Sequence, residues 1–153
     1  MKLEQRLSEL YIDLPEQLFQ VPAAVSPCVQ VDKVLRVLGC LPFAEAKLSA
    51  RGHIPSEVSV EAAKKAAKQC FVQALAQIRH ELGSLESIKR VTSYELFLQT
   101  ESGFADHAKV ADPLSDLIKE LFGKTGKHGR SLVGVASLPQ NASVVLNVVF
   151  EIK

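Results

Sequence analysis

The sequence contains no tryptophan and few other aromatic residues, with two tyrosines and seven phenylalanines among 153 residues. A surface that stacks nucleic-acid bases needs aromatic rings, so this composition does not favour such a surface. An excess of one charge is also missing, because 18 lysines and arginines balance 17 aspartates and glutamates to a formal net charge of +1. Without a strong positive field, tight sequence-independent binding of nucleic acid is disfavoured.

Cysteine is scarce, and its three positions show no C-x-x-C spacing. Cys28, Cys40 and Cys70 are also an odd number, so the sequence predicts buried free thiols rather than a disulfide framework or a zinc knuckle. The four histidines show no H-x-x-x-H or H-E-x-x-H pairing, and we therefore predict no metal site. The stretch Gly123-Lys-Thr lacks the earlier glycine of a phosphate-binding loop, since Ile118 occupies that position.

Long hydrophobic runs are absent as well. No stretch approaches the ~18 apolar residues of a membrane span, and the first ten residues carry acidic side chains, unlike a signal peptide. With 153 residues and 47% hydrophobic content, we expect one soluble, cytoplasmic domain over residues 1–153. Residues 1–20 are expected to form an N-terminal helix and extension.

The clearest positive signal is a helical period that begins at Val60. Apolar residues recur three and four apart as far as Leu82, which predicts a helix over 60–82. Ser59 is placed to cap its first turn, and Gly83 suits the left-handed position after its last turn.

Weaker patterns predict the remaining elements. Asp32-Lys33 forms the turn of a predicted hairpin, Pro113 is expected in the first turn of its helix, and the last two strands are expected to pair directly with each other. The predicted helices cover 2–10 and 106–122, and the predicted strands cover 23–31, 34–38, 88–99, 131–138 and 143–152.

This order favours an α+β fold in which two helices pack on one face of a mixed sheet. The last two strands supply more apolar side chains than one sheet face of a monomer needs, and we expect association through the open face. These side chains are Val133, Val135, Val144, Leu146, Val148 and Phe150.

Arg130 is the candidate binding residue that stands out from the residues alone. It follows a basic turn and begins an apolar strand, where neighbouring residues can hold its planar guanidinium in place. A guanidinium held in this way binds a carboxylate through two hydrogen bonds. Position alone is equally compatible with a structural ion pair.

The run His128-Gly-Arg-Ser-Leu-Val-Gly-Val-Ala-Ser-Leu-Pro-Gln-Asn-Ala142 strongly resembles the C-terminal signature of the YjgF / Rid (reactive-intermediate-deaminase, or RidA) family, also called L-PSP endoribonuclease-like. Gly39-Cys-Leu-Pro42 is similar to the family's Ser-Gly-Gln-x-Pro. The stretches 82–88 and 104–110 resemble the family segments that precede its strand and open its second helix. The resemblance covers roughly residues 20–152, and the N-terminal helix is similar to that of a longer subgroup.

The resemblance implies a chorismate-mutase-like α+β fold and a homotrimer whose sheets surround a central barrel, with a cleft at each subunit interface. Deaminases of the family hydrolyse 2-imino acids to 2-oxo acids and ammonia without a metal or organic cofactor. By this resemblance, Arg130 is the catalytic residue that clamps the substrate carboxylate while an ordered water attacks the imine carbon.

Several polar residues of the family pattern are replaced in this chain. Val145 stands where the family has the glutamate that orients the water, and it cannot do so. Leu38 and Cys40 replace a serine and a glutamine on either side of Gly39. Asp112 replaces an asparagine, Leu132 replaces a cysteine, and Cys28 corresponds to a tyrosine. The implied substrate-binding positions are Arg130, Gly39, Cys40, Asp112, Leu132 and Val145.

Three functional hypotheses follow. The chain is an imine/enamine deaminase that depends on Arg130, or a non-catalytic relative that binds a small acid in the same cleft, or an endoribonuclease as the family label suggests. The arginine suits the first two hypotheses equally, while Val145 and Leu38 favour the second. The near-neutral charge and the sparse aromatic residues disfavour the third.

Overall fold

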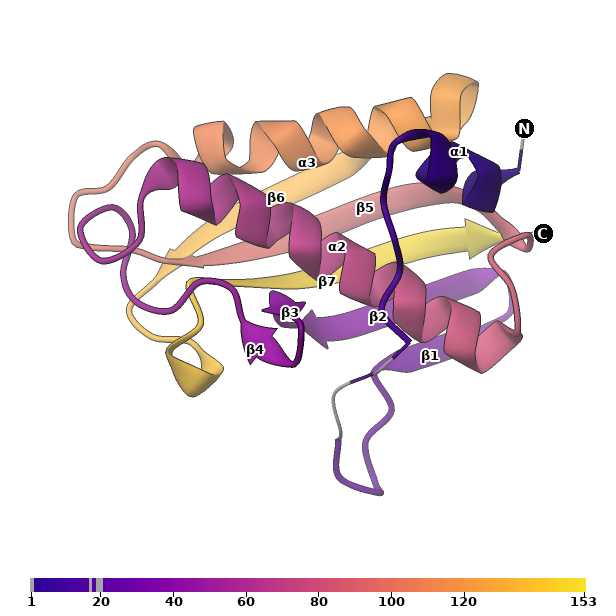
Figure 1. Cartoon of the computed structure of the whole chain (residues 1–153), viewed down its shortest axis with the longest axis horizontal. Helices are drawn as coiled ribbons and strands as arrows, with labels where there is room; N and C mark the ends of the chain where they lie inside the picture. Colours follow the sequence, from indigo (N-terminus) through magenta and orange to yellow (C-terminus); the bar gives the residue numbers. More distant parts are fainter. Residues whose placement is uncertain (1, 17, 19–20) are drawn as a thin grey trace.

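The computed structural model describes residues 2–16, 18 and 21–153, so part of the expected N-terminal extension lies outside the described residues. Helices and strands alternate irregularly along the chain, and Figure 1 shows a helical layer in front of one sheet. In order, the elements are α1 (Leu3–Glu9), β1 (Cys28–Val31), β2 (Val34–Cys40), β3 (Phe43–Ala44), β4 (Lys47–Leu48), α2 (Val60–Leu82), β5 (Ile88–Gln99), α3 (His107–Phe122), the 3-10 turn η1 (Gly123–Thr125), β6 (Gly129–Val135), the 3-10 turn η2 (Pro139–Asn141) and β7 (Val144–Ile152).

The main sheet has the strand order β1-β2-β7-β5-β6. The β5-β6 pair is parallel, and the other neighbouring strands are antiparallel. The expected direct pairing of the last two strands is therefore wrong, because β5 lies between β6 and β7. Central placement suits β7, whose alternate side chains are fully buried along its whole length. Apolar alternation marks a strand but does not select its neighbour.

Helices α2 and α3 pack on the same face of this sheet (Figure 1), which confirms the predicted α+β architecture. The core between the two layers joins α2 and α3 with the inward side chains of β2, β5 and β7. The sheet is mixed, as the sequence predicted, and the predicted hairpin around Asp32-Lys33 is also confirmed.

The predicted caps of α2 are both present. The Ser59 hydroxyl accepts a hydrogen bond from the Ala62 amide at 3.1 Å, which satisfies one of the free N–H groups of the first turn. Gly83 adopts a left-handed φ of 82° directly after the helix. The helix bounds match the predicted range of 60–82.

Helix α3 corrects the expectation for Pro113. The proline lies in the interior of α3, well beyond the first turn. A proline there has no N–H for the carbonyl of Lys109 four residues earlier. Packing keeps the helix continuous, because the buried apolar side chains of Val110, Leu114 and Ile118 flank the proline against the core.

The second face of the sheet is less apolar than the sequence suggested. Four of the six expected side chains, Val144, Leu146, Val148 and Phe150, point into the helical core and are fully buried. Strand alternation places Val133 and Val135 on the open face. Other exposed apolar side chains share that face, namely Val29, Val31, Val34 and Leu38. Association through this face stays a prediction.

In the described part of the chain, no helix combines the length and the apolarity that a membrane crossing requires.

Candidate functional site

Arg130 is the second residue of β6 and lies opposite Tyr94 of the parallel strand β5. Its side chain turns toward α3, where Nη2 lies 2.8 Å from Oδ1 of Asp112. Its other terminal nitrogen, Nη1, donates to the Ser115 hydroxyl at 3.2 Å. The Arg130 side chain is 28% exposed and that of Asp112 is 59% exposed, so the ion pair lies at the surface within reach of a ligand.

The Ser115 hydroxyl is the centre of the network that holds the guanidinium. It lies 2.7 Å from the Tyr94 hydroxyl and 3.0 Å from Nε2 of His128. The second ring nitrogen of His128, Nδ1, lies 2.8 Å from the Gly126 carbonyl, to which it donates. A consistent proton assignment lets Ser115 accept from Arg130 and Tyr94 and donate to Nε2 of His128.

The charge of Arg130 is stabilised by this environment. Partial burial alone would lower the pKa of the guanidinium, but hydrogen bonds to Tyr94 and to the Asp112 carboxylate raise it above its usual value. A guanidinium has five N–H donors, of which the structure engages one with Asp112 and one with Ser115, in addition to the contact with the Tyr94 hydroxyl. The remaining donors leave room for a ligand's carboxylate.

Two of the other predicted positions lie close to Arg130. Asp112 contacts it directly. Leu132 is two residues further along β6, so it points to the same side of the sheet, where it packs on the core and is half-buried. Arg130, Asp112 and Leu132 thus lie on the helical side of β6.

The other three predicted positions lie elsewhere in the single chain. Gly39 and Cys40 end β2, three strand spacings from β6, or about 14 Å at ~4.8 Å per spacing. The Gly39 amide donates to Oδ1 of Asn147 at 2.7 Å. Cys40 is fully buried, and this burial raises the pKa of its thiol to about 12. One chain therefore does not bring these groups to Arg130.

Val145 lies on β7, on the sheet face opposite Arg130. It belongs to a small apolar cluster with Leu41 and Ala142, which is separate from the main core. Its cross-strand neighbour Phe97 packs against the same cluster. An apolar side chain in this setting neither donates nor accepts a hydrogen bond to water.

The sequence patterns did not point to Tyr94 or Ser115, and they marked His128 only as a residue of the basic turn before Arg130 and of the C-terminal signature. Asp112 and Ser115 are three residues apart on one helix, a spacing that places them on the same face. That spacing could have identified Ser115 as a neighbour of Asp112 from the sequence. No comparable signal marks Tyr94, because its place beside Arg130 depends on the β5-β6 pairing, which was not predicted from the sequence.

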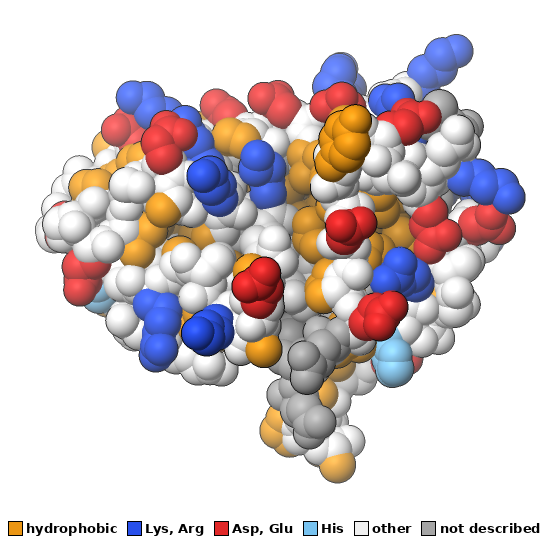
Figure 2. Space-filling model, in the orientation of Figure 1, with side chains coloured by type: hydrophobic (Ala, Val, Ile, Leu, Met, Phe, Trp, Pro, Cys, Tyr) orange, Lys and Arg blue, Asp and Glu red, His pale blue; other side chains and the backbone are white. Residues whose placement is uncertain are grey.

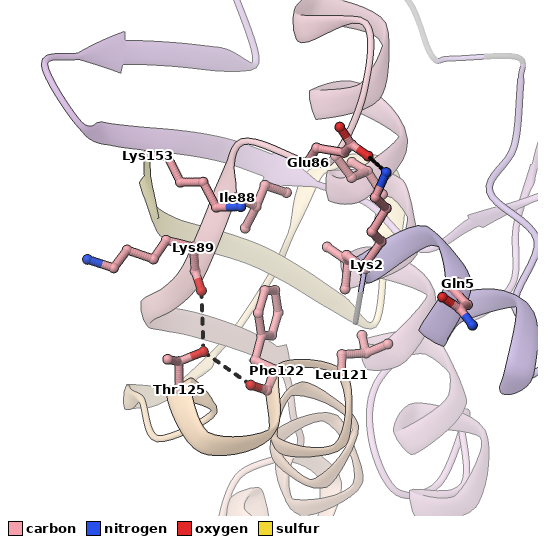
Figure 3. A pocket seen from close by; sticks show the side chains of 11 residues that line it. Lys2, Gln5, Glu86, Ile88, Lys89, Leu121, Phe122, Thr125 and Lys153 are labelled. Atoms are coloured by element: carbon pink, nitrogen blue, oxygen red, sulfur yellow. Dashed lines mark hydrogen bonds and ion pairs between the residues drawn. The ribbon is translucent and has the colours of Figure 1, made fainter.

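A separate hollow of about 580 Å³ lies at the start of β5, between α1 and the end of α3 (Figure 3). Lys2 on its rim pairs with Glu86 at 2.8 Å. The Thr125 hydroxyl donates to the carbonyls of Phe122 and Lys89, which lie at 3.1 and 3.3 Å. Three of the polar side chains around this hollow, those of Lys2, Glu86 and Thr125, are thus engaged by groups that line it. Across residues 2–16, 18 and 21–153, no cluster of three histidine, cysteine, aspartate or glutamate side chains is arranged to hold a metal ion.

Comparison with known proteins agrees with this architecture. Residues 4–152 match the family described as "YjgF/chorismate_mutase-like, putative endoribonuclease". Protein TCP17 of Trypanosoma cruzi is 33% identical over 140 residues, which cover 87% of this chain and 88% of that protein.

Solved structures of other proteins share this fold. Atu1372 of Agrobacterium tumefaciens, described as of unknown function, has a TM-score of 0.87 at 35% identity and covers 98% of this chain and 91% of its own. A "putative endoribonuclease" of Shewanella oneidensis MR-1 has a TM-score of 0.92 at 26% identity, with 99% and 100% covered. TdcF of E. coli, solved with bound serine, shares the fold at a TM-score of 0.64 and 14% identity, with 91% and 96% covered. This chain belongs to the YjgF/chorismate-mutase-like family, which is the Rid or L-PSP family.

Proposed function

We propose that this chain binds small carboxylate-bearing acids at Arg130 and hydrolyses 2-imino acids to 2-oxo acids and ammonia. The observation that carries the proposal is the guanidinium itself, fixed by Asp112 and Ser115 at the surface with N–H donors to spare. A positioned guanidinium binds a carboxylate with defined geometry. Membership of the Rid family supports the same ligand class.

The proposed chemistry needs positioning more than it needs a strong base. Arg130 holds the carboxylate, which fixes the adjacent imine carbon relative to an ordered water. The water adds to that carbon, the C–N bond then breaks, and the nitrogen leaves as ammonia while its carbon becomes a carbonyl. Val145 takes no part in this step, so we assign the orientation of the water to backbone groups.

A second candidate is a non-catalytic member of the family that binds a small acid at the same arginine. The burial of Val145 in an apolar cluster specifically favours it, because no side chain at that position orients water. We do not propose endoribonuclease activity. Over the visible helical face, basic and acidic side chains intermingle (Figure 2), whereas an RNA surface concentrates positive charge.

We further propose that the working form is a homotrimer in the cytoplasm, with the ligand cleft between subunits. Gly39 and Cys40 are remote from Arg130 within one chain, and a neighbouring copy would bring the backbone at the end of its β2 to the cleft, since the Cys40 side chain is buried in its own core. The exposed apolar side chains of the open sheet face support association. The three cysteines are free and buried, which suits a reducing compartment.

An amino-acid oxidase that generates 2-imino acids in the assay tests the enzyme proposal. Wild-type protein should accelerate the release of ammonia, and Arg130→Ala should abolish the acceleration. Arg6→Ala is the matched control, since Arg6 donates to the Glu120 carbonyl on the α1 side of the molecule and should leave the rate unchanged.

If folded wild-type protein accelerates the hydrolysis of neither small nor bulky imines, the enzyme proposal is rejected and the binding-protein proposal remains. In that case, a small carboxylic acid should still raise the melting temperature of the wild type. The same acid should not change the melting temperature of Arg130→Ala.

A further inference from the structure

The carboxylate of Asp112 lies beside the guanidinium that the proposed function assigns to the ligand. One oxygen, Oδ1, lies 2.8 Å from Nη2 of Arg130. The other oxygen, Oδ2, accepts no hydrogen bond from any residue in the described part of the chain, and the side chain is 59% exposed. The surface of the site therefore presents a positive group and a negative group side by side.

A second carboxylate lies on this helix, outside the ion pair. Asp116 lies four residues after Asp112, on the same face of α3 and one turn further along, and it is exposed. The nearest basic side chain on the preceding turn, Lys109, pairs with Asp106 at 3.6 Å rather than with Asp112. Asp112 thus has Arg130 as its ion-pair partner, and its carboxylate also faces a ligand that binds beside Arg130.

This arrangement is unfavourable for a ligand that carries only a carboxylate. Such an anion gains hydrogen bonds from Arg130, but it also places its charge next to that of Asp112, and like charges at close range repel. A ligand with a carboxylate and an adjacent nitrogen cation avoids that cost, because the cation meets the Asp112 carboxylate.

We propose that Arg130 and Asp112 together form a receptor for a zwitterion. Arg130 binds the carboxylate, and Oδ2 of Asp112 accepts a hydrogen bond from the protonated nitrogen of an α-amino acid or a 2-iminium acid. Asp112 is thereby the residue that selects against 2-oxo acids. This inference rests on the proposed function and names the charge state of its ligand.

The assignment also accounts for turnover. A 2-iminium acid and one water give a 2-oxo acid anion and an ammonium ion, so atoms and charge balance with no further reactant. Binding the nitrogen as a cation keeps the imine carbon electron-poor for the attack by water. The product lacks the cation, so Asp112 disfavours its retention and promotes its release.

Titration calorimetry with L-2-aminobutanoate and 2-oxobutanoate tests the inference, because the two acids share one carbon skeleton and differ at the nitrogen. Wild-type protein should bind the amino acid about tenfold more tightly than the oxo acid. Asp112→Asn should abolish or reverse this preference. Asp112→Glu, which keeps the charge, should retain the direction of the preference.

Asp116→Asn is the matched control, since it removes the same charge one turn away from the ion pair and should keep the preference for the amino acid. A wild type that prefers 2-oxobutanoate would overturn the inference and leave the proposed function standing. If folded Asp112→Asn still prefers the amino acid, the inference is likewise overturned and the proposed function still stands. If wild type binds neither acid and accelerates no imine hydrolysis, the proposed function fails as well.

Discussion

Ser115 shows how a single hydroxyl fixes a functional side chain. A hydroxyl has one donor and two acceptor lone pairs, and Arg130, Tyr94 and His128 occupy all three. The Tyr94 ring is itself fully buried and lies 5.6 Å from the His128 ring between centroids. The guanidinium is therefore supported by the core on one side and exposed to a ligand on the other.

Cys40 shows the opposite situation, because its position in the family pattern suggests a ligand contact. Its thiol is fully buried, and burial also raises the pKa of the neighbouring Cys28 thiol, to about 11. Thiols with such pKa values stay protonated and unreactive near neutral pH. The Cys40 thiol therefore cannot take the role of the family glutamate that Val145 replaces, at least within one chain. Asp112 is the charged side chain beside Arg130.

His53 gives a prediction for the pH dependence of stability. Its pKa is raised because Nε2 lies 2.7 Å from the Ala136 carbonyl and because Nδ1 lies 3.1 Å from the Glu57 carboxylate. The pKa of Glu57 is lowered, first because its carboxylate accepts from the His53 backbone N–H at 3.0 Å and second because it accepts from the His53 ring. The histidine stabilises the fold below its usual pKa of 6.5, and this contribution is lost as the pH rises through the raised value. The glutamate contribution is lost as the pH falls below 4.5 toward the lowered value.

The melting temperature of wild type should therefore exceed that of His53→Gln most clearly at about pH 5–6, and the gap should shrink toward pH 9. His80→Gln, at an exposed position of α2, is the matched control and should show no such pH-dependent gap. A gap for His53→Gln that is constant from pH 5 to 9 would show that the ring charge plays no part.

Among the helices, α2 has the most complete set of local signals. Ser59→Ala removes the hydroxyl that accepts from the Ala62 amide, and it should lower the free energy of unfolding by about 1 kcal/mol. Ser59→Asp keeps a capping oxygen and should stay close to wild type. Chemical denaturation of the three proteins measures the difference, and equal losses for Ala and Asp would exclude a capping role.

The strands show where local signals end. The bounds of β5 agree with the predicted strand over 88–99, because alternation is a property of the segment itself. The β3-β4 hairpin was missed, since Glu45 and Ala46 form its turn with positive φ angles of 52° and 65° and neither residue is typical of such a turn. The partner of β6 was also missed, because a parallel pairing depends on how α3 crosses the sheet.

At the scale of the whole molecule, helices cover one face of the sheet, and within the described residues no helix covers the other face. Charged side chains lie on the open face beside the apolar ones, Glu95 from β5 and Arg36 from β2 among them. The exposed apolar side chains of this face are expected to associate with those of another copy. The sheet face also separates Arg130 from Val145, so any step that uses both requires more than one copy of the chain.

Light scattering of the purified protein should give the mass of a trimer, about three times the 16.7 kDa of one chain. Val133→Lys places a charge on the open face and should reduce the mass toward that of a monomer. Val25→Lys changes an exposed valine outside the sheet and should leave the trimer intact. A wild-type mass near that of one chain would contradict the trimer.

The sequence by itself determined the helices, the caps of α2, the long strand β5, the α+β class and the family, because each depends on residues close together in the chain. Only the tertiary structure decided that Arg130 lies beside Tyr94, that Asp112 and Ser115 hold it, and that Cys40 and Val145 lie away from it. The physical reason is strand order and register. These choices depend on packing between segments that are distant in sequence, and a period of apolar residues carries no information about which strands become neighbours.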